Sequence, residues 1–254
     1  VTNLIKNKFL EIARDEKADV MLIEVGGTVG DIENELYLEA VRQLRWDIGS
    51  ENVLYVHLTY VPIPSSVDEQ KSKPTQQSVN LLRSRGIQPD IIIGRCSETI
   101  TKKVKEKIAI FGGMSPNAVI SGVDVEDIYD IPRRFMNEGI HDIIMSKLRL
   151  EINPRIKLSS NNFSREVNIA ICGKYTDLED SYASVIESIK HATFANKVKY
   201  NLKWIETTDI EKGKISVLDA MSGVEGVIVP GGFGIRGSEG KIGIIKYCRE
   251  KGIP

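Results

Sequence analysis

Glu24 and the glycine-rich segment after it are residues whose types and spacing could do chemistry. Residues 20–23 are a short apolar run, which favours a strand buried on both faces, and a helical pattern follows over 34–46. In open α/β sheets, ligands bind where strands end and helices begin. A carboxylate there suits a hard cation such as Mg²⁺, and the glycines of 26–31 let backbone amides approach phosphate closely. A plain strand-to-helix turn with an exposed acid explains the same residue types equally well.

Two lysines on either side of a serine, Lys71 and Lys73, form the second candidate. Pro74 follows them, at the start of a helix predicted over 75–85, and proline is favoured at the first helical position. A helix N-terminus beside lysines binds anions, because its free N–H groups and its dipole both favour phosphate. The residue types alone favour the plainer interpretation of a solvated cationic turn.

Composition limits the class of protein. A chain of 254 residues is long enough for two domains, and a net charge of -1 argues against a general nucleic-acid binder. We find no stretch long and apolar enough to span a bilayer, and the first residues are no signal peptide. Three widely separated cysteines, Cys96, Cys172 and Cys248, fit reduced cytoplasmic thiols better than disulfides or a zinc site.

The elements that must position these residues alternate between strands and helices, which predicts an α/β fold with mostly parallel sheets. Further strands are expected over 52–61, 91–93, 118–121, 167–172, 199–205 and 224–229. Further helices are expected over 4–16, 101–111, 133–147, 181–195, 216–221 and 241–251. The polar segment 150–166 shows no clear period and is typical of an interdomain linker.

Several reactive side chains are interpreted as structural. His57 lies within a strand pattern without a second ligand nearby, and His191 lies late in a predicted helix. Cys248 falls inside the last predicted helix, away from any strand-to-helix turn, so we reject it as a nucleophile. The glycines of 230–237 follow a predicted strand, where a tight turn is the usual explanation for a glycine pair.

The full strings around these candidates resemble the CTP synthases, glutamine-dependent ligases that aminate UTP to CTP. VGGTVGDIE, KSKPTQ, IYDIP and PGGFGIRG occur in the family's order, and the matches run from about residue 18 to the C-terminus. The resemblance implies two Rossmann-like α/β domains. They are a partial P-loop-like amidoligase domain over 1–149 and, after a linker over 150–166, the N-terminal part of a class I glutamine amidotransferase domain over 167–254.

The resemblance also implies roles for individual residues. Glu24 is expected to be a metal ligand, and Gly232 to donate its N–H to the oxyanion formed from glutamine. The residues expected at UTP or CTP are Asp31, Ile32, Glu33, Lys71, Ser72, Lys73, Pro74, Thr75, Gln76 and Lys107. The residues expected at the adenine of ATP, chiefly through backbone, are Val123, Asp124 and Val125.

In the family's mechanism, ATP phosphorylates the uracil carbonyl oxygen, and ammonia released from glutamine displaces that phosphate. Mg²⁺ neutralises phosphate charge during the transfer. The resemblance further implies feedback inhibition by CTP, GTP as a candidate allosteric activator, and a homotetramer with the UTP site at a subunit junction. Neither nucleic acid nor membrane is an expected partner.

The chain departs from the family pattern in several places. Ser72 stands where the family usually has Thr, and Asp68 stands where it usually has Gly. We find no GxxxxGK[ST] string and no second acidic magnesium ligand, and the nucleophilic cysteine is expected beyond Pro254. We therefore expect an internal fragment that performs neither half-reaction alone.

Two alternatives remain open at this stage. One is another amidoligase, either a glutamine-dependent enzyme acting on cobyrinic acid or a dethiobiotin-type ligase, neither of which has use for the KSKPTQ triphosphate site. The other is a non-catalytic relative that senses nucleotides or only assembles. The sequence beyond Pro254 separates that relative from an enzyme.

Overall fold

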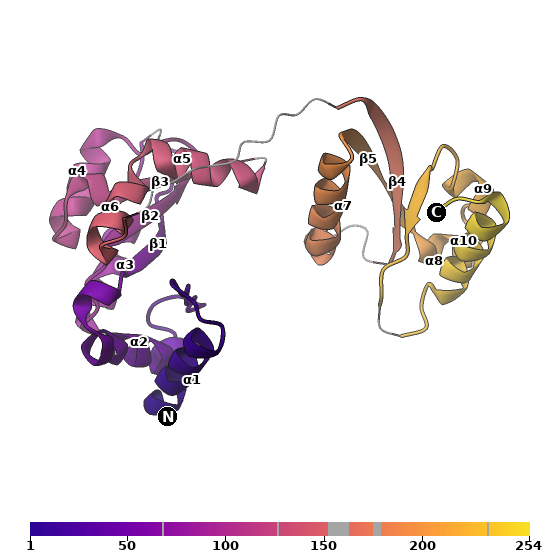
Figure 1. Ribbon diagram of the computed structural model, residues 1–254. Helices are drawn as coiled ribbons and strands as arrows, with labels where there is room; N and C mark the ends of the chain where they lie inside the picture. The colour runs from indigo at the N-terminus through magenta and orange to yellow at the C-terminus, as the bar shows by residue number, and fades with distance from the viewer. Residues whose placement is uncertain (68, 126, 152–162, 175–178, 233) are drawn as a thin grey trace. The chain divides into compact units, whose positions relative to one another are not determined.

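The computed structural model describes residues 1–254 apart from 68, 126, 152–162, 175–178 and 233. The chain divides into two compact units, Val1–Lys157 (unit 1) and Leu158–Pro254 (unit 2). Each unit contains a three-stranded parallel sheet with helices packed on it, so the predicted α/β class is confirmed (Figure 1). Asp68 and most of the predicted linker lie outside the described residues.

The sheet of unit 1 has the strand order β1-β2-β3, and all three strands run parallel. The strands are β1 (Val56–Tyr60), β2 (Ile91–Cys96) and β3 (Val119–Val123). The helices of this unit are α1 (Thr2–Asp15), α2 (Glu35–Ile48), α3 (Lys73–Ser84), α4 (Lys102–Gly112), α5 (Ile131–Asn137) and α6 (Ile140–Leu148). Because the strands are parallel, their carboxyl ends lie at one edge of the sheet.

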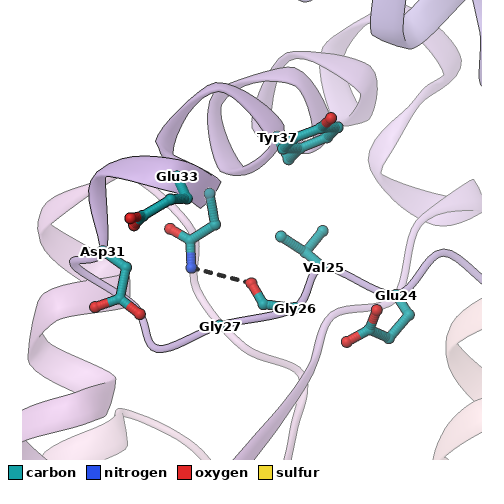
Figure 2. Close-up of a pocket in the computed structure, with 8 residues that line it drawn as sticks. Glu24, Val25, Gly26, Gly27, Asp31, Glu33 and Tyr37 are labelled. Carbon is teal, nitrogen blue, oxygen red and sulfur yellow. Dashed lines mark hydrogen bonds between the residues drawn. The ribbon is translucent and has the colours of Figure 1, made fainter. Parts of the chain in front are cut away.

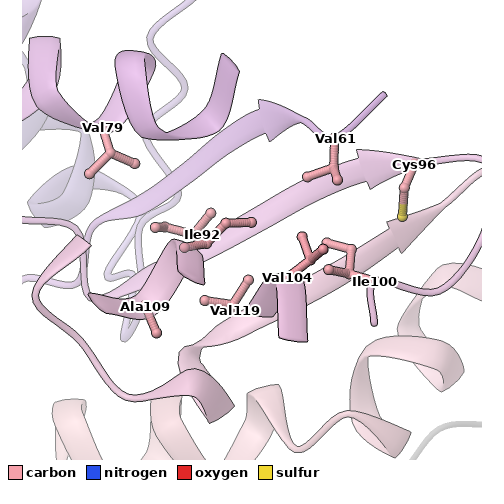
Figure 3. Close-up of a cluster of buried hydrophobic side chains, with 9 residues drawn as sticks. Val61, Val79, Ile92, Cys96, Ile100, Val104, Ala109 and Val119 are labelled. Atoms are coloured by element: carbon pink, nitrogen blue, oxygen red, sulfur yellow. The ribbon is translucent and has the colours of Figure 1, made fainter. Parts of the chain in front are cut away.

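Two helices, α3 and α4, cover one face of this sheet and close its hydrophobic core (Figure 3). Val79 of α3 and Ile108 of α4 are almost fully buried against Ile92 and Val119 of the sheet. His57 lies in the same sheet, 7% exposed, and its Nε2 lies 2.8 Å from the Ser78 hydroxyl of α3. Burial lowers the pKa of His57, so the side chain is a neutral structural group.

Unit 2 has the strand order β5-β4-β6, again parallel. Its strands are β4 (Arg165–Gly173), β5 (Val198–Glu206) and β6 (Gly226–Ile228), and its helices are α7 (Ala183–Ala195), α8 (Thr207–Glu211), α9 (Val217–Ala220) and α10 (Ser238–Lys251). Helix α10 approaches α8 so closely that a Cβ on Gly240 would lie 2.0 Å from the Thr207 carbonyl oxygen. Only glycine fits there without displacing backbone.

Two predictions of secondary structure were wrong. Residues 20–23 form no strand, since no described strand pairs with this segment, and Leu22 is 94% exposed because no described part of the chain covers it. The single helix predicted over 133–147 is two helices, α5 and α6. Gly139 separates them with a left-handed backbone (φ +81°), which glycine adopts without steric cost.

No helix in the described part of the chain has both the length and the apolar character needed to cross a membrane.

Candidate functional site

Several of the residues implied by the resemblance lie at the carboxyl edge of the unit 1 sheet. Helix α3 follows β1, helix α4 follows β2, and Val123 ends β3. The chain between β1 and α3 stays at this edge, since the Lys71 N–H donates to the Pro62 carbonyl (2.9 Å) just after β1. This edge of an open α/β sheet is where ligands bind.

Lys71 and Lys107 come together around a carboxylate that the sequence analysis did not single out. The Lys71 ammonium donates to Glu69 Oε2 at 2.8 Å. The hydrogen bond from Lys71 is the main reason that the pKa of Glu69 is lowered, and the charges of Lys107 and Lys103 lower it further. We call Lys71, Lys103 and Lys107 the cation set. Its members on α4 are four residues apart and therefore lie on one face of the helix.

The first turn of α3 contains the rest of the KSKPTQ segment. Pro74 lies at one of the first positions of helix α3, and the neighbouring Lys73 is exposed. Gln76 is buried, and its side-chain amide donates to the Ser72 hydroxyl at 2.9 Å. Thr75 is fully buried, and its hydroxyl donates to the Tyr60 carbonyl at 3.0 Å, which gives this side chain a structural role.

The glycine-rich loop of 24–34 is held by its own polar side chains. Asp31 Oδ2 accepts the Thr28 N–H at 2.8 Å. The buried Asn34 side chain donates to the Thr28 carbonyl (2.9 Å) and to the Gly26 carbonyl (3.2 Å). Asn34 was missed by the sequence analysis, which looked for charged groups rather than for the amide that fixes the loop.

The same loop lines a cavity of about 660 Å³. Its lining residues are Glu24, Val25, Gly26, Gly27, Asp31, Glu33, Asn34 and Tyr37. Figure 2 shows Asp31 and Glu33 at one end of the loop and Glu24 at the other. Ile32 lies between the two acids and is 88% exposed. The structure thus brings three of the predicted acids to one cavity.

Glu24 is the carboxylate that the sequence predicts to bind a metal ion, and it lines this cavity. Among the described residues, no group of three or more His, Cys, Asp or Glu side chains is arranged to hold a metal ion. Mg²⁺ usually takes only one or two carboxylates and completes its shell with water and substrate phosphates. Glu24, an exposed oxygen ligand on a cavity, fits one such position.

The cavity and the cation set lie at opposite ends of α3. Glu35, just after the loop, accepts from Arg85 Nε at 2.7 Å, and Arg85 directly follows the last residue of α3. A Cβ on Gly30 of the loop would lie 4.0 Å from Leu81, in the last turn of α3. A helix of 12 residues is roughly 18 Å long, and Lys71 precedes its first residue. One copy of the chain therefore does not bring the acids and the cations together.

The residues expected at adenine, Val123 to Val125, occupy the end of β3. The Asp124 side chain pairs with Arg95 at 2.8 Å, and its backbone N–H donates to the Cys96 carbonyl at 3.0 Å. The Asp124 N–H is therefore already used within unit 1 and is not free to donate to a base.

In unit 2, Gly232 lies on an exposed loop after β6, flanked by two lysines that the sequence analysis missed. A Cβ at this position would lie 3.3 Å from Lys174 Cε and 3.6 Å from Lys241 Nζ. Lys241 Nζ donates to the Pro230 carbonyl at 2.8 Å, and Arg236 donates to the Lys174 carbonyl at 3.0 Å. Cationic side chains thus surround the loop predicted to stabilise an oxyanion.

The thiols of the chain are poor nucleophiles. All three cysteines are free and buried. Burial raises the pKa of Cys172 to about 12 and that of Cys96 to about 11, and it also raises the pKa of Cys248. The reactive species is the thiolate, which a raised pKa disfavours. The rejection of Cys248 as a nucleophile agrees with this environment.

Comparison with known proteins covers both units. A family model described as CTP synthase N-terminus matches residues 1–150, and one described as glutamine amidotransferase class-I matches residues 177–254. This chain is 45%, 47% and 47% identical to the CTP synthases of Borreliella burgdorferi, Thermococcus gammatolerans and Nitratidesulfovibrio vulgaris, respectively. These alignments cover 100% of this chain and 47–48% of each relative, so the chain spans about half the length of the curated relatives it matches. The chain belongs to the CTP synthase family.

Proposed function

We propose that the whole protein converts UTP to CTP, with ATP as phosphoryl donor and glutamine or ammonia as nitrogen source. The observation that carries the proposal is the cation set at the carboxyl edge of the unit 1 sheet, beside the N-terminus of α3. Family membership supports the same function. Residues 1–149 would belong to the amidoligase domain, 150–166 to a linker, and 167–254 to the amidotransferase domain.

The cationic half of the UTP site would hold the triphosphate. Lys71, Lys73 and Lys107 supply positive charge, and the first turn of α3 supplies free N–H groups and the positive end of its dipole. The Ser72 hydroxyl accepts from Gln76 and can still donate its own proton to a phosphate oxygen. These groups neutralise and orient the anion before any chemistry begins.

The acidic half would hold the pyrimidine nucleotide from a second copy of the chain. Asp31, Ile32 and Glu33 lie at the far end of α3 from Lys71, so a site that uses both halves draws them from two copies. Such a site requires an oligomer with the UTP site at a subunit junction, and family membership favours a homotetramer. CTP would occupy the same junction as a feedback inhibitor, and GTP is proposed as an allosteric activator.

Glu24 would supply one carboxylate to Mg²⁺, whose charge would offset that of the phosphates when bound. The backbone of Val123 to Val125 would border the adenine of ATP. In the reaction, phosphorylation of the uracil carbonyl oxygen creates a leaving group, and ammonia displaces it to form the new C–N bond. The chain's own contribution to this step is to position UTP and to screen its charge.

Unit 2 would contribute to the release of ammonia from glutamine. The Gly232 N–H is the proposed donor to the oxyanion of the tetrahedral intermediate, because glycine has no side chain of its own to block the substrate. Buried thiols with raised pKa values make the three cysteines of this chain unsuitable nucleophiles. Unpaired cysteines also support a cytoplasmic location.

The experiment is to assay the full-length protein that contains this chain for CTP formation from UTP, ATP and either glutamine or ammonia. We expect CTP with both nitrogen donors and none when ATP is omitted. A protein that binds UTP but forms no CTP under any of these conditions would contradict the proposed activity.

A further inference from the structure

Glu69 is an acidic residue within the cluster of lysines proposed to bind phosphate. Its Oε2 accepts a hydrogen bond from the Lys71 ammonium at 2.8 Å. Both side chains are partly open to solvent, with 56% of the Glu69 side chain and 39% of the Lys71 side chain exposed. The carboxylate is therefore accessible from the same solvent from which a phosphate would approach Lys71.

The surrounding charges make Glu69 the internal counterion of the whole cation set. Lys71 has the largest influence on its pKa, and Lys107 and Lys103 add to it from α4. One carboxylate thus offsets one of three positive charges contributed by two separate segments. A triphosphate entering here must either displace this carboxylate from Lys71 or remain beside it.

The backbone on which Glu69 sits is anchored. The adjacent Gln70 is buried, and its amide donates to the Thr99 carbonyl at 2.9 Å and accepts from the Thr101 N–H at 2.8 Å. These bonds tie the residue to the start of α4. These bonds hold the backbone next to Glu69 in place, whereas the exposed Glu69 side chain can rotate away at little cost, because a surface ion pair contributes little to stability.

We propose that Glu69 competes with the nucleotide phosphates for Lys71 and thereby weakens UTP binding, so that the site fills only at higher UTP concentration. The proposal rests on the proposed UTP site. If the phosphates displace Glu69, the Lys71–Glu69 hydrogen bond is lost. If Glu69 stays in place, its negative charge lies beside the negative triphosphate. Either way, removing the charge of Glu69 while keeping its shape leaves Lys71 free for phosphate.

The test is the Glu69→Gln variant of the full-length protein, with equilibrium binding of UTP and of inorganic tripolyphosphate measured at low and at high salt. We expect both probes to bind about two- to fivefold tighter at low salt, since an exposed ion pair that the phosphate must otherwise break is worth no more than that in affinity. The gain should shrink at high salt, because exposed charges are screened.

Glu11→Gln is the matched control, because Glu11 also forms an exposed pair with a lysine, Lys8, at 3.2 Å. It should leave the affinity for both probes unchanged. In a Lys71→Gln background, Glu69→Gln should increase the affinity for both probes by less, since the lysine for which Glu69 and phosphate compete is absent.

Unchanged or weaker binding of both probes by Glu69→Gln would overturn the proposal while leaving the UTP site intact, provided that Lys71→Gln alone weakens UTP binding. If Lys71→Gln leaves UTP binding unchanged, the proposed UTP site is itself wrong, and the role of Glu69 falls with it.

Discussion

Replacing Lys71 by glutamine should weaken UTP binding by a calculable amount. The substitution keeps a hydrogen-bond donor and removes a charge, so the change reports the electrostatic part of the interaction. Among the described residues Lys71 forms its ion pair with the exposed Glu69, and the loss of such a surface pair costs only about 0–1 kcal/mol of folding free energy. The cost of the substitution should therefore appear in ligand binding rather than in folding.

The magnitude follows from the position of Lys71. A unit charge about 4 Å from the ammonium interacts by about 1 kcal/mol in bulk water and about 4 kcal/mol near a protein surface. The side chain is 39% exposed, which favours a value between these limits. A loss of about 2 kcal/mol corresponds to roughly 30-fold weaker UTP binding.

The assay is titration calorimetry with UTP on the full-length protein, at fixed ionic strength. Lys8→Gln is the control, since it removes one lysine from the matched exposed pair with Glu11 on α1. A Kd within about twofold of the wild type for Lys71→Gln, a difference of only some 0.4 kcal/mol, would refute the assignment of Lys71 to the phosphates.

The remaining predictions concern unit 2. Gly240→Ala should lower the free energy of unfolding by at least about 3 kcal/mol, because its Cβ would lie 2.0 Å from the Thr207 carbonyl oxygen. Gly243→Ala on the same helix should cost far less, and urea unfolding measures both. Gly232→Ala should fold normally, since its new Cβ meets only the ends of two lysine side chains, Lys174 Cε at 3.3 Å and Lys241 Nζ at 3.6 Å. The variant should abolish CTP formation from glutamine but not from ammonia; equal loss of both would exclude the oxyanion role. Folding raises the pKa of Cys172 to about 12, so the folded state retains this proton and stability falls as pH rises above about 9. The free energy of unfolding, measured with urea between pH 8 and pH 10, should fall less steeply with pH in Cys172→Ala than in the wild type. An identical fall in both proteins would show that Cys172 does not cause it.

The elements of the two sheets were predictable because each strand is an apolar run followed by turn residues. The run at 20–23 has the same local pattern and forms no strand, since pairing depends on a neighbour that local sequence does not specify. Gly139 was passed over inside a helical pattern, although its left-handed backbone divides α5 from α6. The local pattern of apolar residues reveals neither the pairing partner of a strand nor the backbone conformation of a glycine.

The sequence predicted the individual residues of the candidate site but not which of them lie close together. The placement of Lys71 and Lys107 around one carboxylate follows from the parallel sheet, which brings the starts of α3 and α4 to one edge. The role of Glu69 depends on charges brought together from two segments, which its sequence neighbours alone do not reveal. The distance of Asp31 and Glu33 from the lysines depends on which end of α3 the loop packs against.

In the proposed function, one UTP site combines the acids of one copy of the chain with the lysines of another. The most direct test is to co-express Glu33→Gln and Lys71→Gln subunits of the full-length protein and to assay CTP formation at a UTP concentration where neither variant alone is active. Random mixing of the two subunits should restore about a quarter of the wild-type activity, because about a quarter of the junctions then carry two unaltered halves. No recovery in co-purified mixed oligomers would contradict a shared site and place both halves within one chain.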